Sequence, residues 1–174
     1  AIMRDVDDMQ ELLDGFLDFA RNDALDGLEP CMPREILDAA VSDAARGGQS
    51  VTLGPVTGPD QHVTMRPMAV RRALDNLIGN ALRYGTKAEV CLDITDRTVR
   101  FTVEDDGPGI PATSREAAMS PFVRLDPSRN QDKGTGVGLG LSIVADIARN
   151  HGGLLRLGDS ARLGGLKAEL VLAR

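Results

Sequence analysis

The run GTGVGLGLSIV, residues 134–144, constrains the fold most, because it places four glycines at alternate positions and then enters an amphipathic helix. A flexible linker would rarely interleave valine and leucine with glycine in this way. A glycine-rich loop that ends at a helix N-terminus offers free backbone N–H groups and the positive end of the helix dipole, which together suit a phosphate group. The spacing differs from GxxxxGK[ST] and from a GxGxxG that follows a strand. We therefore predict a phosphate-binding loop of another kind.

Hydrophobic periodicity predicts that helices and strands are interleaved along the chain. The strongest helical stripe covers 67–84, and Gly85 ends it. Further helices are predicted at 5–22, 33–47 and 140–151, a short one near 114–119, and strands at 51–53, 62–65, 88–95, 98–104, 154–157 and 167–172. Residues 22–29 are predicted to be a linker, and Asp96-Arg97 the turn of a hairpin. This order predicts an α+β fold in which helices cover one face of a mixed sheet, with helix 5–22 added at the N-terminus.

Composition narrows the classes of protein that the chain can represent. Its 174 residues suffice for one domain with a core, and a net charge of -6 argues against a nucleic-acid binder. No apolar run approaches the ~20 residues needed to span a membrane, and we expect this portion to carry no signal peptide and to be soluble. Cys31 and Cys91 lie far apart in the sequence and are expected to be free thiols.

Two asparagines in the helix predicted at 67–84 suggest a cation site. Asn76 and Asn80 lie four residues apart, hence on one helix face, and Arg83 and Tyr84 follow one turn later. Amide oxygens can ligate a hard cation such as Mg²⁺, and a neighbouring cationic side chain can meet phosphate. A solvated polar face would show the same pattern, so this stretch alone leaves both interpretations open.

The stretch TVEDDGPGIP, residues 102–111, ends a predicted strand in two adjacent acids and a Gly-Pro-Gly sequence. An ionised carboxylate only accepts hydrogen bonds, so Asp105 could accept one from an exocyclic amine such as that of adenine. Gly107 and Gly109 would let the backbone approach a flat ring. Asp-Gly and Pro-Gly are also common in surface turns, which the stretch alone favours.

The three stretches, taken together and in this order, resemble the ATP-binding domain of sensor histidine kinases. Their sequences are most similar to those of the osmolarity sensors. These kinases share an ATPase family with gyrase B, Hsp90 and MutL. The matching motifs are RALDNLIGNALRYG (the N box), VEDDGPGI (G1), PFVR (F), GVGLGLSIVADIARNHGG (G2) and the closing strand GGLKAELVL. The resemblance implies a two-layer α/β sandwich, the Bergerat ATP-binding fold, over 27–174. Residues 1–26 would be the second helix of the dimerisation and phosphoacceptor hairpin, with its linker.

The resemblance also implies the cofactors ATP and Mg²⁺ and a role for each matching residue. Asp105 would accept from the adenine N6 amine, and Asn80 would ligate Mg²⁺ with support from Asn76. Residues 122–135 would form the ATP lid. The implied catalytic residues are Asn76, Asn80 and Arg124. The implied ATP-binding residues are Asn76, Asn80, Arg83, Tyr84, Asp105, Gly107, Gly109, Ile110, Phe122, Arg124, Arg129, Thr135, Gly136, Val137, Gly138, Leu139, Gly140 and Leu141. Val137 departs from the pattern, which usually has a hydroxyl residue there.

The same resemblance predicts the reaction and the partners. Hydrolysing relatives carry a glutamate base at position 76, whereas an asparagine cannot take that proton and favours transfer to a protein acceptor. Neither His62 nor His151 is followed by an acid, so we expect structural roles for both and an acceptor histidine upstream. The expected partners are that acceptor helix, a response regulator receiver domain and a second copy of the full-length protein, and no nucleic acid; the fragment would be monomeric or weakly dimeric.

Two alternatives remain within the same fold, a serine-directed kinase of the anti-sigma type and a nucleotide-gated interaction module without transfer activity. The chain opens at Ala1-Ile2-Met3, and we expect it to be the cytoplasmic portion of a bacterial inner-membrane sensor.

Overall fold

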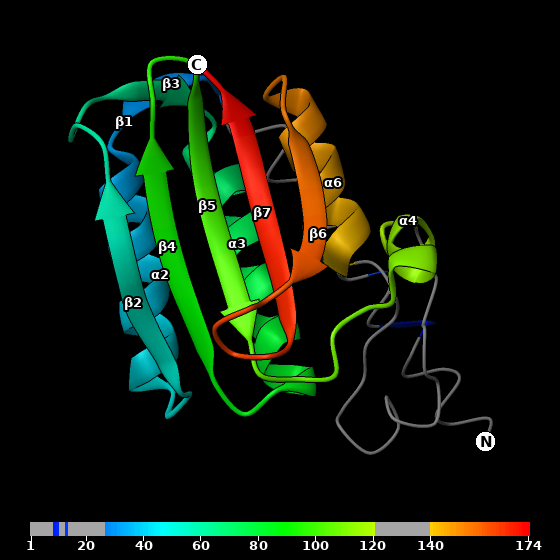
Figure 1. Cartoon of the computed structure of the whole chain (residues 1–174). Helices are drawn as coiled ribbons and strands as arrows, with labels where there is room; N and C mark the ends of the chain where they lie inside the picture. The colour runs from blue at the N-terminus through cyan, green and yellow to red at the C-terminus, as the bar shows by residue number, and fades with distance from the viewer. Residues whose placement is uncertain (1–8, 11–12, 14–26, 121–139) are drawn as a thin grey trace.

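The structure, a computed structural model, describes residues 27–120 and 140–174, together with Met9, Gln10 and Leu13. Figure 1 shows two layers, a five-stranded sheet and the helices that cover one of its faces. Along the sheet the strands are β2 (Val51–Thr57), β4 (Ala88–Ile94), β5 (Thr98–Asp105), β7 (Leu166–Ala173) and β6 (Leu154–Asp159). The helices of the second layer are α2 (Pro33–Arg46), α3 (Pro67–Tyr84) and α6 (Gly140–Asn150). Strand β2 runs parallel to β4 and the other neighbours are antiparallel, which confirms the predicted mixed sheet.

The core lies between these layers because each strand and each helix presents one apolar face to the other layer. In β4, buried apolar side chains alternate with more exposed ones. In β5 they alternate with polar side chains, and Leu92 of β4 lies opposite Phe101 of β5. Helix α3 contributes its predicted apolar face, contacts both α2 and α6, and packs on β5. It begins at Pro67, whose missing N–H is tolerated in the first turn, and ends before Gly85.

Strands β1 (Glu29–Cys31) and β2 differ from the prediction. Strand β1 pairs with β3 (Val63–Met65) as a small antiparallel sheet, so the predicted linker at 22–29 is wrong at Glu29. A strand of three residues that contains Pro30 is too short to show the alternating pattern from which a strand could be predicted. Strand β2 continues past Leu53 through Gly54-Pro55, and the register shifts between Leu53 and Val56. Proline is tolerated there because β2 is an edge strand. The short helix predicted near 114–119 is present as η1 (Ala112–Ser114) and α4 (Arg115–Ala118).

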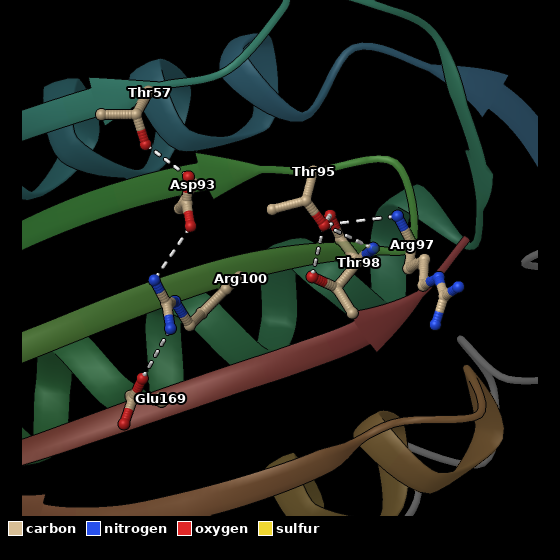
Figure 2. Close-up of polar contacts among 7 residues, drawn as sticks. All are labelled: Thr57, Asp93, Thr95, Arg97, Thr98, Arg100 and Glu169. Atoms are coloured by element: carbon tan, nitrogen blue, oxygen red, sulfur yellow. Dashed lines mark hydrogen bonds and ion pairs between the residues drawn. The ribbon is translucent and has the colours of Figure 1, made fainter.

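The second face of the sheet carries a row of mutually paired polar side chains (Figure 2). The Asp93 carboxylate accepts from the Thr57 hydroxyl and, at 2.9 Å, from the Arg100 guanidinium, which also pairs with Glu169 at 3.4 Å. At the predicted hairpin turn, the Thr95 hydroxyl oxygen accepts from the backbone N–H groups of Arg97 and Thr98. The charges on this part of the face are therefore satisfied within the sheet itself.

His151 has a structural role, as expected. Its Nε2 accepts a hydrogen bond from the Arg66 backbone N–H at 3.0 Å, so its Nδ1 carries the proton and donates to the Ile147 carbonyl at 2.8 Å. The ring thus joins the end of α6 to the residue before α3, and neither ring nitrogen is available as a nucleophile. His62 is exposed in the loop before β3.

The predicted N-terminal helix lies almost wholly outside the described residues and stays a prediction. Met9, Gln10 and Leu13 are helical, and the side chains of Met9 and Leu13 are 69% and 52% exposed. Within the described part of the chain, no helix combines the length and apolarity that crossing a bilayer requires.

Candidate functional site

Asp105, the last residue of β5, is a buried carboxylate held by backbone donors. Its side chain points to the helix-covered face of the sheet and is 4% exposed. Oδ1 accepts from the Gly107 N–H at 2.9 Å and from the Leu166 N–H at 3.1 Å. Since both donors contact Oδ1, Oδ2 keeps its acceptor capacity within the described part of the chain. Burial raises the pKa of Asp105 above its usual range, and the Asp106 charge adds to the rise, although the two backbone donors offset part of it.

Asp106, the neighbouring acid, has a different task, which the sequence analysis did not assign. Its carboxylate accepts from the Thr86 N–H at 2.6 Å, from the Thr86 hydroxyl and from the Lys87 N–H at 3.1 Å. These bonds, those from Thr86 first, lower the pKa of Asp106 to about 2. Asp106 therefore fastens the connection between α3 and β4 to the end of β5, which explains why two acids stand side by side.

The lowered pKa of Asp106 predicts a pH-dependent contribution to stability. A carboxyl group whose pKa is lower in the folded than in the unfolded chain stabilises the fold above its usual pKa, and this contribution is lost as the pH falls. We expect Asp106→Ala to unfold at lower denaturant concentration than wild type at pH 7, and the difference to vanish between about pH 4 and pH 2. Urea unfolding across this range measures it, with the exposed Asp60→Ala as control. A difference that stays constant down to pH 2 would contradict the assignment.

Close glycine packing brings the end of α3, the start of the G1 loop and the start of β7 together around Asp105. A Cβ on Gly107 would lie 2.9 Å from the Tyr84 carbonyl oxygen and 3.2 Å from Asp105 Oδ1. A Cβ on Gly165 would collide with the Asp105 side chain and with the Gly107 nitrogen. Gly107 is therefore required for the close packing of this loop on the end of α3, and its predicted place beside a flat ring stays a prediction. Gly165 stands in the quoted closing-strand motif, although the motif alone assigned it no role.

The segment after the G1 loop is held by Arg115, which sequence reasoning also missed. Gly109 has a φ of 73°, in the left-handed region that favours glycine. Arg115 donates from Nε to the Ile110 carbonyl at 3.0 Å and from Nη2 to Asp159 Oδ1 at 2.9 Å. The half-buried Ile110 is thereby tied to the end of β6.

The polar residues of α3 lie along the same helix that ends at the Asp105 loop. Asn76, Asn80, Arg83 and Tyr84 are all half-buried. Asn76 Nδ2 is buried and has no hydrogen-bond partner among the residues that the structure describes. A buried amide donor of this kind calls for an acceptor such as a water or a ligand oxygen.

The remaining predicted site residues divide into two groups. Gly140 and Leu141 begin α6, which contacts α3, and the Leu141 side chain belongs to the core. The others lie outside the described residues: Phe122, Arg124, Arg129, Thr135, Gly136, Val137, Gly138 and Leu139. The structure therefore packs the G1 loop against the end of the N-box helix, and it packs the helix that follows the glycine run along the same N-box helix.

Comparison with known proteins assigns the family. Residues 65–173 match the family model described as histidine kinase-, DNA gyrase B-, and HSP90-like ATPase. The chain belongs to this ATPase family. The chain is 40% identical to the sensor histidine kinase CpxA of Escherichia coli, over 79% of its own length. It is 38% identical to the Escherichia coli sensor protein RstB over 96% of the chain. The chain spans 30% of the length of CpxA and 39% of that of RstB.

Solved structures of this ATPase family confirm the fold. The ATP-binding domain of PrrB from Mycobacterium tuberculosis has a TM-score of 0.68 at 29% identity, over 85% of this chain and 98% of that one. The histidine kinase domain of the Escherichia coli osmosensor EnvZ has a TM-score of 0.62 at 34% identity, over 83% of this chain and 88% of that one. The predicted Bergerat fold and the resemblance to sensor histidine kinases are therefore confirmed.

Proposed function

We propose that the chain is the ATP-binding and kinase portion of a sensor histidine kinase. It would transfer the γ-phosphate of ATP to a histidine on the dimerisation hairpin of its full-length protein, for relay to a response regulator receiver domain. The observation that carries this proposal is the buried, backbone-held carboxylate of Asp105 beside the end of α3. Family membership and the similarity to sensor kinases support it.

Adenine recognition falls to Asp105 and the loop that follows it. Oδ1 is engaged by two backbone donors, so Oδ2 would accept from the adenine N6 amine. Burial raises the pKa of Asp105, a shift that is typical of a carboxylate in a ligand site. Gly107, Gly109 and Ile110 would line the base.

The phosphate side of the site fits a magnesium–nucleotide complex. When bound, Mg²⁺ would neutralise phosphate charge. Asn80 would hold it through its amide oxygen, and the buried Asn76 Nδ2 would donate to a water or a phosphate oxygen. Arg83 would meet a phosphate and Tyr84 the adenine or ribose. Residues 122–135 would form the ATP lid, from which Arg124 and Arg129 would approach the nucleotide. Gly136, Gly138 and Gly140 would cradle the phosphates.

Residue 76 favours phosphoryl transfer to a protein over hydrolysis. An asparagine amide does not accept a proton from an attacking water, so it cannot act as the general base of a hydrolase. The chain's own residues would bind and orient the nucleotide, and the nucleophile would come from the acceptor histidine.

Residues 1–26 would belong to the dimerisation and phosphoacceptor hairpin, and 27–174 to the ATP-binding domain. The exposed apolar side chains of Met9 and Leu13 support a helix that packs on a partner outside this chain. Similarity to bacterial sensor proteins supports a homodimeric, membrane-attached sensor with this portion in the cytoplasm.

Nucleotide binding tests the assignment of the site. Calorimetric titration with Mg²⁺ present should show ATP bound about tenfold or more tightly than inosine triphosphate, whose C6 carbonyl oxygen would face the Asp105 carboxylate. Equal affinity for the two nucleotides would contradict adenine recognition by Asp105.

A further inference from the structure

The turn between β6 and β7, residues 160–165, is closed by its own hydrogen bonds. The Ser160 N–H donates to the Gly165 carbonyl at 2.8 Å, and the Gly164 N–H donates to the Ser160 carbonyl at 2.9 Å. The Ser160 hydroxyl oxygen accepts from the Leu163 N–H at 3.0 Å. Gly164 has a φ of 89°, which favours glycine. Ser160 thus makes three of the contacts that define the shape of the turn.

This turn contacts the last two residues of β5 on both faces of the sheet. Figure 1 shows the β6–β7 connection beside the end of β5. On one face, the Ser160 hydroxyl donates to Glu104 Oε1 at 3.1 Å. On the other face, the Leu166 N–H, directly after the turn, donates to Asp105 Oδ1 at 3.1 Å. Between the two backbones, the Gly165 N–H donates to the Asp105 carbonyl at 3.0 Å.

The contact between Ser160 and Glu104 is buried, with the two residues 3% and 6% exposed. A buried hydrogen bond to a charged group is costly to break, because the carboxylate oxygen left behind lacks a partner. Loss of the Ser160 hydroxyl would leave both Glu104 Oε1 and the Leu163 N–H without this partner. The turn would then relax, and with it the Leu166 N–H that orients Asp105.

We infer that Ser160 is a positioning residue for adenine recognition: held by Glu104, it fixes the turn whose following backbone N–H orients the Asp105 carboxylate. This inference rests on the proposed function. Ser160 does not touch the nucleotide in this scheme. Its effect is on selectivity for the base, because only the adenine amine depends on the direction of Asp105 Oδ2.

The test compares the affinity ratio for ATP over inosine triphosphate in Ser160→Ala and in wild type. We expect the ratio to fall about fivefold or more, toward that of Asp105→Asn, while the affinity for inosine triphosphate changes little. Arg162→Ala is the matched control: it removes an exposed ion pair to Glu89 from the same turn and should leave the ratio unchanged. Thermal unfolding of each variant reports on the fold.

A second pair of variants keeps the test decisive if Ser160→Ala does not fold. Glu104→Gln retains an acceptor oxygen for Ser160 and should keep most of the selectivity, whereas Glu104→Ala should lose it. An unchanged ratio in Ser160→Ala or Glu104→Ala, or an equal loss of affinity for both nucleotides, would overturn the inference. A wild-type chain without any preference for ATP would overturn the proposed function and the inference together.

Discussion

Replacing Asp105 by asparagine is expected to weaken ATP binding by roughly 1.5–3 kcal/mol, about tenfold or more in affinity, without lowering stability. Asparagine has nearly the shape of aspartate and can still accept the backbone hydrogen bonds at Oδ1. Its NH₂ group, however, would place a donor against the donor of the adenine amine. The loss is therefore specific to the base.

The stability of the same variant follows from the raised pKa of Asp105. A carboxyl group whose pKa is higher in the folded chain than in the unfolded one destabilises the fold as the pH rises through the folded-state pKa. Asparagine does not titrate, so it makes no such pH-dependent contribution to stability. We expect the stability of Asp105→Asn relative to wild type to rise with pH through the titration of Asp105 and then to level off.

Calorimetry with ATP and urea unfolding, both on wild type and on Asp105→Asn, measure the two effects. Asp93→Asn is a suitable control, because Asp93 is an acid on the other face of the same sheet. Unchanged ATP affinity in Asp105→Asn would remove Asp105 from the base site. Weak binding accompanied by a large loss of stability would show that the carboxylate is structural.

Asn80→Ala is expected to abolish the gain in ATP affinity that Mg²⁺ provides. If the Asn80 amide oxygen ligates the ion, its removal should cost at least about tenfold in affinity for the magnesium complex. Alanine favours helix more than asparagine does, so the half-buried position in α3 should tolerate the change. Titrations of ATP with Mg²⁺ and with a chelator, on each chain, separate metal binding from nucleotide binding.

The control for Asn80→Ala is Asn150→Ala, which alters an exposed asparagine at the end of α6. It should preserve the full difference between the titrations with Mg²⁺ and with chelator. A similar difference in Asn80→Ala would mean that another residue holds the ion.

Much of the fold could be predicted from sequence because its elements carry strong periodic signals. Helix α3 and the hairpin of β4 and β5 lie where the apolar pattern placed them, since each buries one face against the other layer. Strand β1 and the second half of β2 could not be predicted, because they depend on pairing with β3 and β4, far away in the sequence. Pro30 and Pro55 also obscure the strand pattern.

The candidate site was predictable where one residue carries the chemistry, and not where residues act through tertiary contacts. Asp105 stands at the end of its strand, as predicted, and the structure adds that its carboxylate is buried. The division of labour between Asp105 and Asp106 depends on Thr86 and Lys87, about twenty residues earlier. The role of Ser160 likewise depends on its contact with Glu104 of β5, which lies 56 residues earlier in the sequence.

The most direct measurement of the central claim is transfer of label from γ-labelled ATP to a histidine. The chain alone should not label itself at His151, because both ring nitrogens of that residue are engaged in hydrogen bonds. It should not hydrolyse ATP to release labelled phosphate either, because residue 76 is not a base. A separately supplied acceptor hairpin should gain acid-labile label, slowly, because no tether raises its local concentration. Asn80→Ala should prevent this transfer. Acid-labile label on the chain alone that is lost in His62→Gln or His151→Gln, or release of labelled phosphate without any labelling of the hairpin, would contradict the account.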